Sequence, residues 1–154
     1  MSDLKIPKWS LSLGLWRFMV LAFVLSSTMA YQGCKPSLFK DQTAINNTKD
    51  LKVMADRLIG AATGQFSTSK TDVDAFRQKV DDQITYEEGR GDQNKKKVEM
   101  WKLLMNPNEN LMGGFLKRWE SEGSLSAGFV GQLKPIIADN FQKIIDLEEG
   151  RPSR

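Results

Sequence analysis

Histidine is absent from this chain of 154 residues, and cysteine occurs once, at Cys34. Histidine is the commonest general base in catalysis and the commonest metal ligand, so its absence excludes the usual Ser-His and Cys-His nucleophile arrangements. A single cysteine cannot form an intrachain disulfide, and it cannot supply the thiolate sets of zinc or iron–sulfur sites. We therefore expect no catalytic residue, no metal site and no cofactor.

Paired carboxylates are the remaining candidates for acid–base chemistry. They occur as Asp81–Asp82, Glu87–Glu88 and Glu148–Glu149. Adjacent residues on a helix point about 100° apart, so the two members of each pair diverge and cannot converge on one substrate. We interpret all three pairs as solvated helix surface, which favours a protein that is not an enzyme.

Long apolar runs are also missing. The longest uninterrupted one, Phe18–Leu25, has about eight residues, whereas a membrane-spanning helix needs ~20. It follows a positively charged start and precedes the small residues "SSTMA", an order typical of export signals. Trp9–Ala30 is long enough to span a membrane, but it carries Arg17 near its middle at a cost of roughly 2.5–3.5 kcal/mol. We therefore expect residues 1–33 to be a removable signal peptide, with a retained membrane anchor as the alternative.

Cys34 ends the sequence "YQGC". Gly33 matches the small residue that precedes the cysteine in a lipobox, whereas Gln32 and Tyr31 depart from its usual pattern. The chain thus resembles bacterial lipoproteins as a class, and the resemblance implies a lipid on Cys34 and a membrane-anchored, extracytoplasmic location in the cell envelope. The A-x-A-like "TMA" offers a second cleavage site after Ala30, which would leave Cys34 as a free thiol.

The net charge of +3 and the pI near 9.0 do not indicate a nucleic-acid partner. Lys5, Lys8, Arg17 and Asp3 precede Cys34, so the part that follows carries a net charge of only about +1. The "KKK" at 95–97 is short and has no interleaved aromatic residues, so we expect no phosphate-binding groove.

After Asn47 the apolar residues recur every three or four positions and almost never alternate strictly, which predicts helices throughout. Four amphipathic segments with short connections predict an all-α fold, an up-down helical bundle of about four helices. The expected divisions are the signal or anchor segment 1–33, a polar tether 34–47, the bundle domain 48–150 and a tail 151–154. The expected helices run from Thr48 to Ala62, from Thr71 to the "GRGD" at 89–92, from about Val98 to Trp119 with an interruption, and from about Ser126 to Glu149.

Several short motifs predict where these helices begin, bend or end. The T-x-x-D of Thr71–Asp74 matches a capping box at the start of the second helix. In "NPNE", Asn106 suits an N-cap and Pro107 the first helical position, so a helix ends near Met105 and a new one starts, or one helix kinks there. Pro135 should bend or restart the last helix, and Gly150 should end it.

Trp101 and Trp119 lie on the apolar stripe of the third helical segment, and core packing is their first interpretation. Tryptophan is also enriched at binding hot spots. Because "LMGGFLKRW" at 111–119 combines methionine, glycines, aromatics and cations, Met112, Phe115, Trp119 and Trp101 are candidates for contact with an unidentified protein partner.

Size, four helices, the cysteine near the mature terminus and the "LEEGR" at 147–151 also resemble the four-helix-bundle assembly lipoprotein of photosystem II. That family has S-F-T-T-M in its third helix, where this chain has "VEMWKLLMN". The leading hypothesis is a non-enzymatic envelope lipoprotein that acts in protein interaction or assembly at the membrane surface. One alternative is a factor similar to the photosystem II assembly lipoprotein, and the other is a small enzyme or ligand carrier with an inter-helical pocket. A solid core with an exposed Trp/Met patch would favour the leading hypothesis, and an apolar cavity or carboxylates converging in a cleft would favour the enzyme or carrier.

Overall fold

In a computed structural model, residues 40–151 form an all-α bundle, and the structure is described for these residues only. Cys34, the predicted leader 1–33 and most of the predicted tail lie outside this range, so their assignments remain predictions. The bundle contains α2 (Gln42–Ala61), α3 (Phe66–Gly89), the 3₁₀ turn η2 (Asp92–Asn94), α4 (Lys95–Leu104), α5 (Met112–Glu122) and α6 (Ala127–Glu148). Within residues 40–151 there is no strand, and none of the helices is both long and apolar enough to cross a bilayer.

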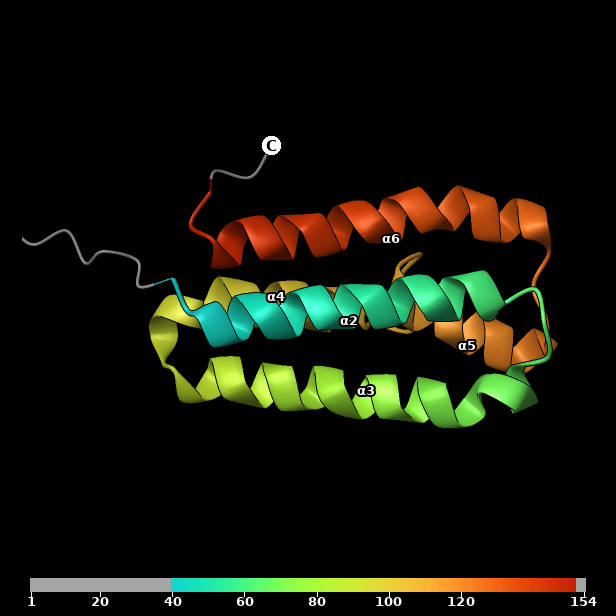
Figure 1. The fold of residues 1–154 in the computed structure, drawn as a ribbon, viewed down its shortest axis with the longest axis horizontal. Coiled ribbons are helices and arrows are strands. Elements are labelled where there is room, and N and C mark those ends of the chain that lie inside the picture. Colours follow the sequence, from blue (N-terminus) through green and yellow to red (C-terminus); the bar gives the residue numbers. More distant parts are fainter. Residues whose placement is uncertain (1–39, 152–154) are drawn as a thin grey trace, which may run out of the picture. The chain divides into compact units, whose positions relative to one another are not determined.

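The helices run up and down in four columns. Figure 1 shows α2, α3 and α6 as three long rods, with α4 and α5 following one another along the remaining side. The predicted third helix is therefore two helices in one column. The all-α bundle predicted from the apolar spacing is confirmed.

The core is filled by large side chains from every column. Aromatic pairs cross between helices: the Phe66 and Trp119 ring centroids lie 5.4 Å apart, and those of Trp101 and Phe141 lie 5.8 Å apart, both edge to face. Such pairs contribute about 0.5–1.5 kcal/mol beyond the burial of their area. The fully buried set also includes the aliphatic residues Ile59, Leu104, Leu116, Ile137 and Ile144.

The bundle's first helix begins earlier than expected, at Gln42 and not at Thr48, so residues 42–47 belong to the bundle and not to the tether. The Asp41 carboxylate caps the helix because one of its oxygens accepts hydrogen bonds from the N–H groups of Thr43 and Ala44. The buried face continues through this first turn, since Ala44 and the residue after it, Ile45, are both buried.

The start of α3 was also predicted too late. The helix begins at Phe66, and the T-x-x-D of Thr71–Asp74 lies inside it. Phe66 is fixed by tertiary contacts, because its ring packs on Trp119 and its N–H donates to the carbonyl of Gly123 at 2.6 Å. Contacts with a distant part of the chain outweigh the local capping pattern here.

The loops at the end of the bundle opposite the N-terminus of α2 are joined by neutral hydrogen bonds. Besides the bond from Phe66 to Gly123, the N–H of Leu125 donates to the carbonyl of Ala62 at 2.8 Å. The indole Nε1–H of Trp119 donates to the carbonyl of Gly64 at 3.0 Å. The α2–α3 loop and the α5–α6 loop are therefore connected without any ionised group.

The "NPNE" motif ends α4 as expected but does not cap α5, so this part of the prediction was wrong. The side-chain oxygen of Asn106 accepts from the N–H of Asn108 at 3.0 Å, which closes a turn, and α5 starts only at Met112. Of the two effects predicted for Pro135, a restart of the last helix is wrong, because α6 is continuous around this residue. Gly150, at φ +67°, ends the helix as predicted.

Two glycines at the start of α5 allow this turn to fold back on the helix. A Cβ atom on Gly113 would overlap the carbonyl group of Met105, and one on Gly114 would overlap the carbonyl of Glu109. Backbone atoms cannot move aside as a flexible side chain can. The close approach of the 105–109 turn to α5 therefore requires glycine at both positions.

We expect Gly113→Ala to lower the free energy of unfolding by about 1–3 kcal/mol, because the added methyl group must displace the Met105 backbone. Gly60→Ala is the control, since an added Cβ meets nothing at that position in α2. It should be neutral or stabilising by up to about 1 kcal/mol. Urea unfolding followed by circular dichroism measures both, and equal effects of the two changes would contradict the close contact.

Candidate functional site

Charged side chains are buried at the end of the bundle where α2 and α4 begin and α3 and α6 end (Figure 1). We call Glu87, Arg90, Lys97 and Glu148 the ion cluster. The side chains of Glu87 and Glu148 are 0% exposed and that of Lys97 is 10% exposed. Ionised groups are almost never buried to this degree without partners, so the arrangement of the partners defines this site.

The ion cluster connects all the columns of the bundle. From α4, Lys97 Nζ lies 2.5 Å from Glu148 Oε2 on α6 and 3.9 Å from Glu87 Oε2 on α3. From the end of α3, Arg90 lies 3.2 Å from Glu87 Oε2 and 3.2 Å from the carboxylate of Asp41, the cap of α2. One lysine and one arginine thus face three carboxyl groups.

The ion cluster corrects the prediction that all paired glutamates are solvated surface. Asp81 and Asp82 are both exposed as predicted, and Glu87 and Glu88 do diverge, since Glu88 is exposed while Glu87 is buried. The inner members of two different pairs, Glu87 and Glu148, then converge between helices. A signal was present in the sequence, because Val80, Gln83 and Glu87 continue one inward stripe at spacings of three and four.

Burial raises the pKa of Glu87 from 4.5 to about 7, and the negative charge of Glu148 adds to the increase. Lys97 and Arg90 act in the opposite direction but do not outweigh these effects. The Glu148 carboxylate, as an acceptor for a proton on Glu87, also raises the pKa of Glu87. Among the described atoms, Glu148 Oε1 is buried without a hydrogen-bond donor, and a proton on Glu87 is suited to supply one.

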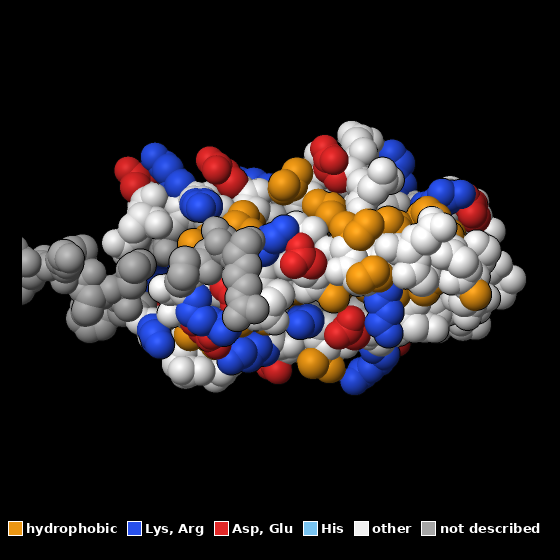
Figure 2. Space-filling view, turned by 90° about the horizontal axis from the view of Figure 1, so that it is seen from above, with side chains coloured by type: hydrophobic (Ala, Val, Ile, Leu, Met, Phe, Trp, Pro, Cys, Tyr) orange, Lys and Arg blue, Asp and Glu red, His pale blue; other side chains and the backbone are white. Residues whose placement is uncertain are grey.

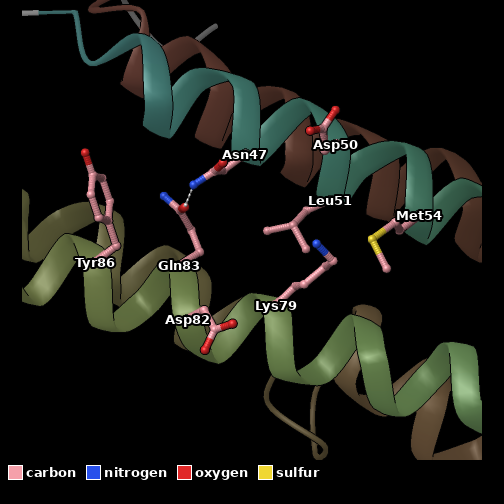
Figure 3. A pocket seen from close by; sticks show the side chains of 8 residues that line it. All are labelled: Asn47, Asp50, Leu51, Met54, Lys79, Asp82, Gln83 and Tyr86. Carbon is pink, nitrogen blue, oxygen red and sulfur yellow. Dashed lines mark hydrogen bonds between the residues drawn. The ribbon is translucent and has the colours of Figure 1, made fainter.

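A polar chain leads from the ion cluster to the surface. Gln83 is 2% exposed, and its Nε2–H donates to Glu87 Oε1 at 2.9 Å. The side-chain oxygen of Gln83 accepts a hydrogen bond from Asn47 Nδ2–H at 3.0 Å, which joins α3 to α2 (Figure 3). Asn47 and Gln83 line a groove of about 330 Å³ between these helices, next to Tyr86 at its end.

The side chains that line this groove are poorly suited to proton transfer or metal binding. Figure 3 shows Leu51 reaching from α2 and Lys79 from α3 into its middle. At its end, the Tyr86 hydroxyl donates to Asp41 Oδ2 at 2.6 Å. This bond raises the pKa of Tyr86 and lowers that of Asp41, so near neutral pH the phenol is not poised to release a proton nor the carboxylate to accept one. No group of three or more Asp, Glu, His or Cys side chains in residues 40–151 is placed to hold a metal ion.

The four residues predicted as partner contacts all lie in the core. Trp101, Met112, Phe115 and Trp119 are 0% exposed, because the apolar stripe of α4 and α5 faces inward along its whole length. Core packing, the first interpretation of the two tryptophans, is confirmed, and these four residues form no exposed Trp/Met patch. The large apolar side chains exposed in the described range are Val53, Tyr86, Leu103 and Ile136, and Figure 2 shows hydrophobic side chains gathered over the middle of one face.

We expect Lys97→Met to lower the free energy of unfolding by about 3–5 kcal/mol, because it leaves two buried carboxyl groups without their shared cation. The control is Lys96→Met, which removes a neighbouring lysine that is exposed and lies in no ion pair of the described residues. It should change stability by no more than about 0.5 kcal/mol. Chemical unfolding of both variants tests this, and a small effect at Lys97 would mean that the ion cluster is hydrated.

Comparisons with protein-family models, with curated proteins and with solved structures found no match. The arguments for function are therefore the sequence motifs and the geometry of the described residues.

Proposed function

We propose that the chain is a non-enzymatic lipoprotein of the cell envelope, whose helical bundle acts in protein interaction or assembly at the membrane surface. The observation that carries the proposal is the short distance along the chain between Cys34 and α2. Seven residues, 35–41, separate the two. At 3.3–3.6 Å per extended residue they reach about 25 Å at most, so a lipid on Cys34 would keep the bundle close to the bilayer.

The burial of the convergent carboxyl groups argues against an enzyme. Glu87 and Glu148 are the pair that resembles a catalytic dyad, yet neither side chain is exposed. Their oxygens bind Lys97, Arg90 and Gln83, so a substrate would have to replace these contacts. A general acid or base must come within about 3 Å of the reacting atom, which these positions do not allow in the closed bundle.

The packing of the core argues against a carrier of apolar ligands. Carriers enclose their ligand in a cavity lined mostly by apolar groups. The α2–α3 groove is open to solvent, and polar side chains such as Asn47, Asp50 and Lys79 form much of its lining. Large aromatic side chains occupy the space between the helices. Both features favour a bundle that contacts other macromolecules through its surface.

We expect wild-type protein to fractionate with membranes and to have the mass of a chain that begins at Cys34 with lipid attached. Cys34→Ser should be released into the extracytoplasmic fraction, provided that cleavage after Ala30 can occur. Two acyl chains anchor a protein stably, whereas one gives only marginal binding. Cell fractionation with intact-mass measurement tests the proposal, and Ser37→Ala is the control that should stay membrane-bound.

Two results would contradict this proposal. If Cys34→Ser stays in the membrane at the full mass of 154 residues, the leader is a retained anchor and Cys34 carries no lipid. If the wild-type protein is itself free of the membrane and begins at Tyr31, an ordinary signal peptidase has removed the leader. Either result would leave the helical fold unaffected.

A further inference from the structure

We propose that Glu87, Lys97 and Glu148 form a pH-dependent latch, which holds the last turn of α6 against the end of α3 and the start of α4 while Glu87 carries a proton, and which opens when Glu87 ionises. The latch joins three helices at one buried point: Glu87 on α3, Lys97 on α4 and Glu148 on α6. It goes beyond the proposed lipoprotein role and does not depend on it.

The charges around Glu87 balance only when it is neutral. Lys97 faces it from α4, Glu148 from α6 and Arg90 from the end of α3, and Asp41, the cap of α2, shares Arg90. With Glu87 protonated, two carboxylates face two cations. Ionisation adds a third negative charge to this buried group, and that charge repels the Glu148 carboxylate, with which Glu87 shares Lys97.

The hydrogen bonding of Glu148 also makes closure of the latch depend on the proton of Glu87. Glu87 Oε1 accepts from Gln83 and Glu87 Oε2 accepts from Arg90 at 3.2 Å, while Lys97 binds Glu148 Oε2. The other oxygen of Glu148, Oε1, is buried and has no donor among the described atoms. A hydroxyl on Glu87 is suited to donate to it, and ionised Glu87 has no hydrogen to give. Loss of the proton therefore adds an unsatisfied buried acceptor to the charge repulsion.

The last turn of α6 is the element that should move. The α3 and α4 helices are joined by the short segment 90–94 and remain neighbours. Besides the latch, the buried side chain of Ile145 and one ion pair among the described residues hold the last turn of α6 to its neighbours. The ion pair is Lys49–Glu149 at 2.9 Å, in which Lys49 is half exposed. Exposed ion pairs are weak and are screened by salt.

The direction of the pH effect follows from the raised pKa of Glu87. The closed latch binds the proton up to pH about 7, whereas a free glutamate releases it near 4.5. Between these values the closed state holds more protons than the open state, so closure is favoured at low pH and weakens as pH rises through 7. The equilibrium constant for opening should rise up to about a hundred-fold from pH 5 to pH 8.

Opening of the latch would uncover an aromatic layer. Trp101 follows Lys97 by about one turn of α4, and Phe141 precedes Glu148 by about two turns of α6. Their rings contact one another directly beneath the ion cluster, with the indole N–H of Trp101 unpaired among the described atoms. The latch thus controls access to Trp101, which is fully buried while the latch is closed.

The test is hydrogen–deuterium exchange of the full chain between pH 5 and 9, corrected for the intrinsic pH dependence of exchange. A peptide that covers residues 142–151 should lose protection as pH rises, whereas one that covers 127–134 of the same helix should not. Glu87→Gln is the matched neutral variant and should keep residues 142–151 protected at every pH. Glu88→Gln is the control, because Glu88 is exposed and pairs with Lys102 outside the ion cluster.

Three results would overturn the latch. Protection of residues 142–151 that is independent of pH in the wild-type chain would show that Glu87 does not control the contact. A pH dependence that persists in Glu87→Gln would assign the effect to another group. Loss of the dependence in Glu88→Gln would show that surface charge, and not the buried carboxyl group, is responsible.

Discussion

The contact of one lysine with two buried carboxyl groups is the interaction on which one whole end of the bundle depends. Lys97 projects from α4 between Glu87 and Glu148, so three helix ends meet at its ammonium group. Transfer of these groups out of water is costly and is repaid only while every partner is in place. The ends of α3 and α6 are therefore joined through Lys97, which lies between their buried carboxyl groups.

This arrangement brings one residue from each of three helices together at a single buried point. The rest of the interface consists of apolar residues at helical spacing, and such stripes tolerate a shift of one helix past another with little loss of buried area. The Glu87–Lys97–Glu148 contact exists in one register only, because the three side chains come from three different helices. Buried polar groups that select one register at a cost in stability are best known in coiled coils.

Spacing alone predicted the helices well, because a buried stripe repeats every three or four residues whatever its partners are. It failed where a contact with a distant segment decided the outcome. The start of α3 is set by Phe66 on Trp119, and the turn at Asn106 is set by the glycines of the next helix. The burial of Glu87 and Glu148 depends on a partner about sixty residues away along the chain, which local patterns cannot show.

The two ends of the bundle are held by different kinds of bond, and this difference gives its unfolding a direction. At the end away from the ion cluster, the bonds from Leu125 to Ala62 and from Trp119 to Gly64 join uncharged groups, whose strength changes little with pH or salt. At the other end the bonds are ionic. A rise in pH should therefore loosen the bundle from the charged end alone. The loops at the neutral end should stay joined by their hydrogen bonds.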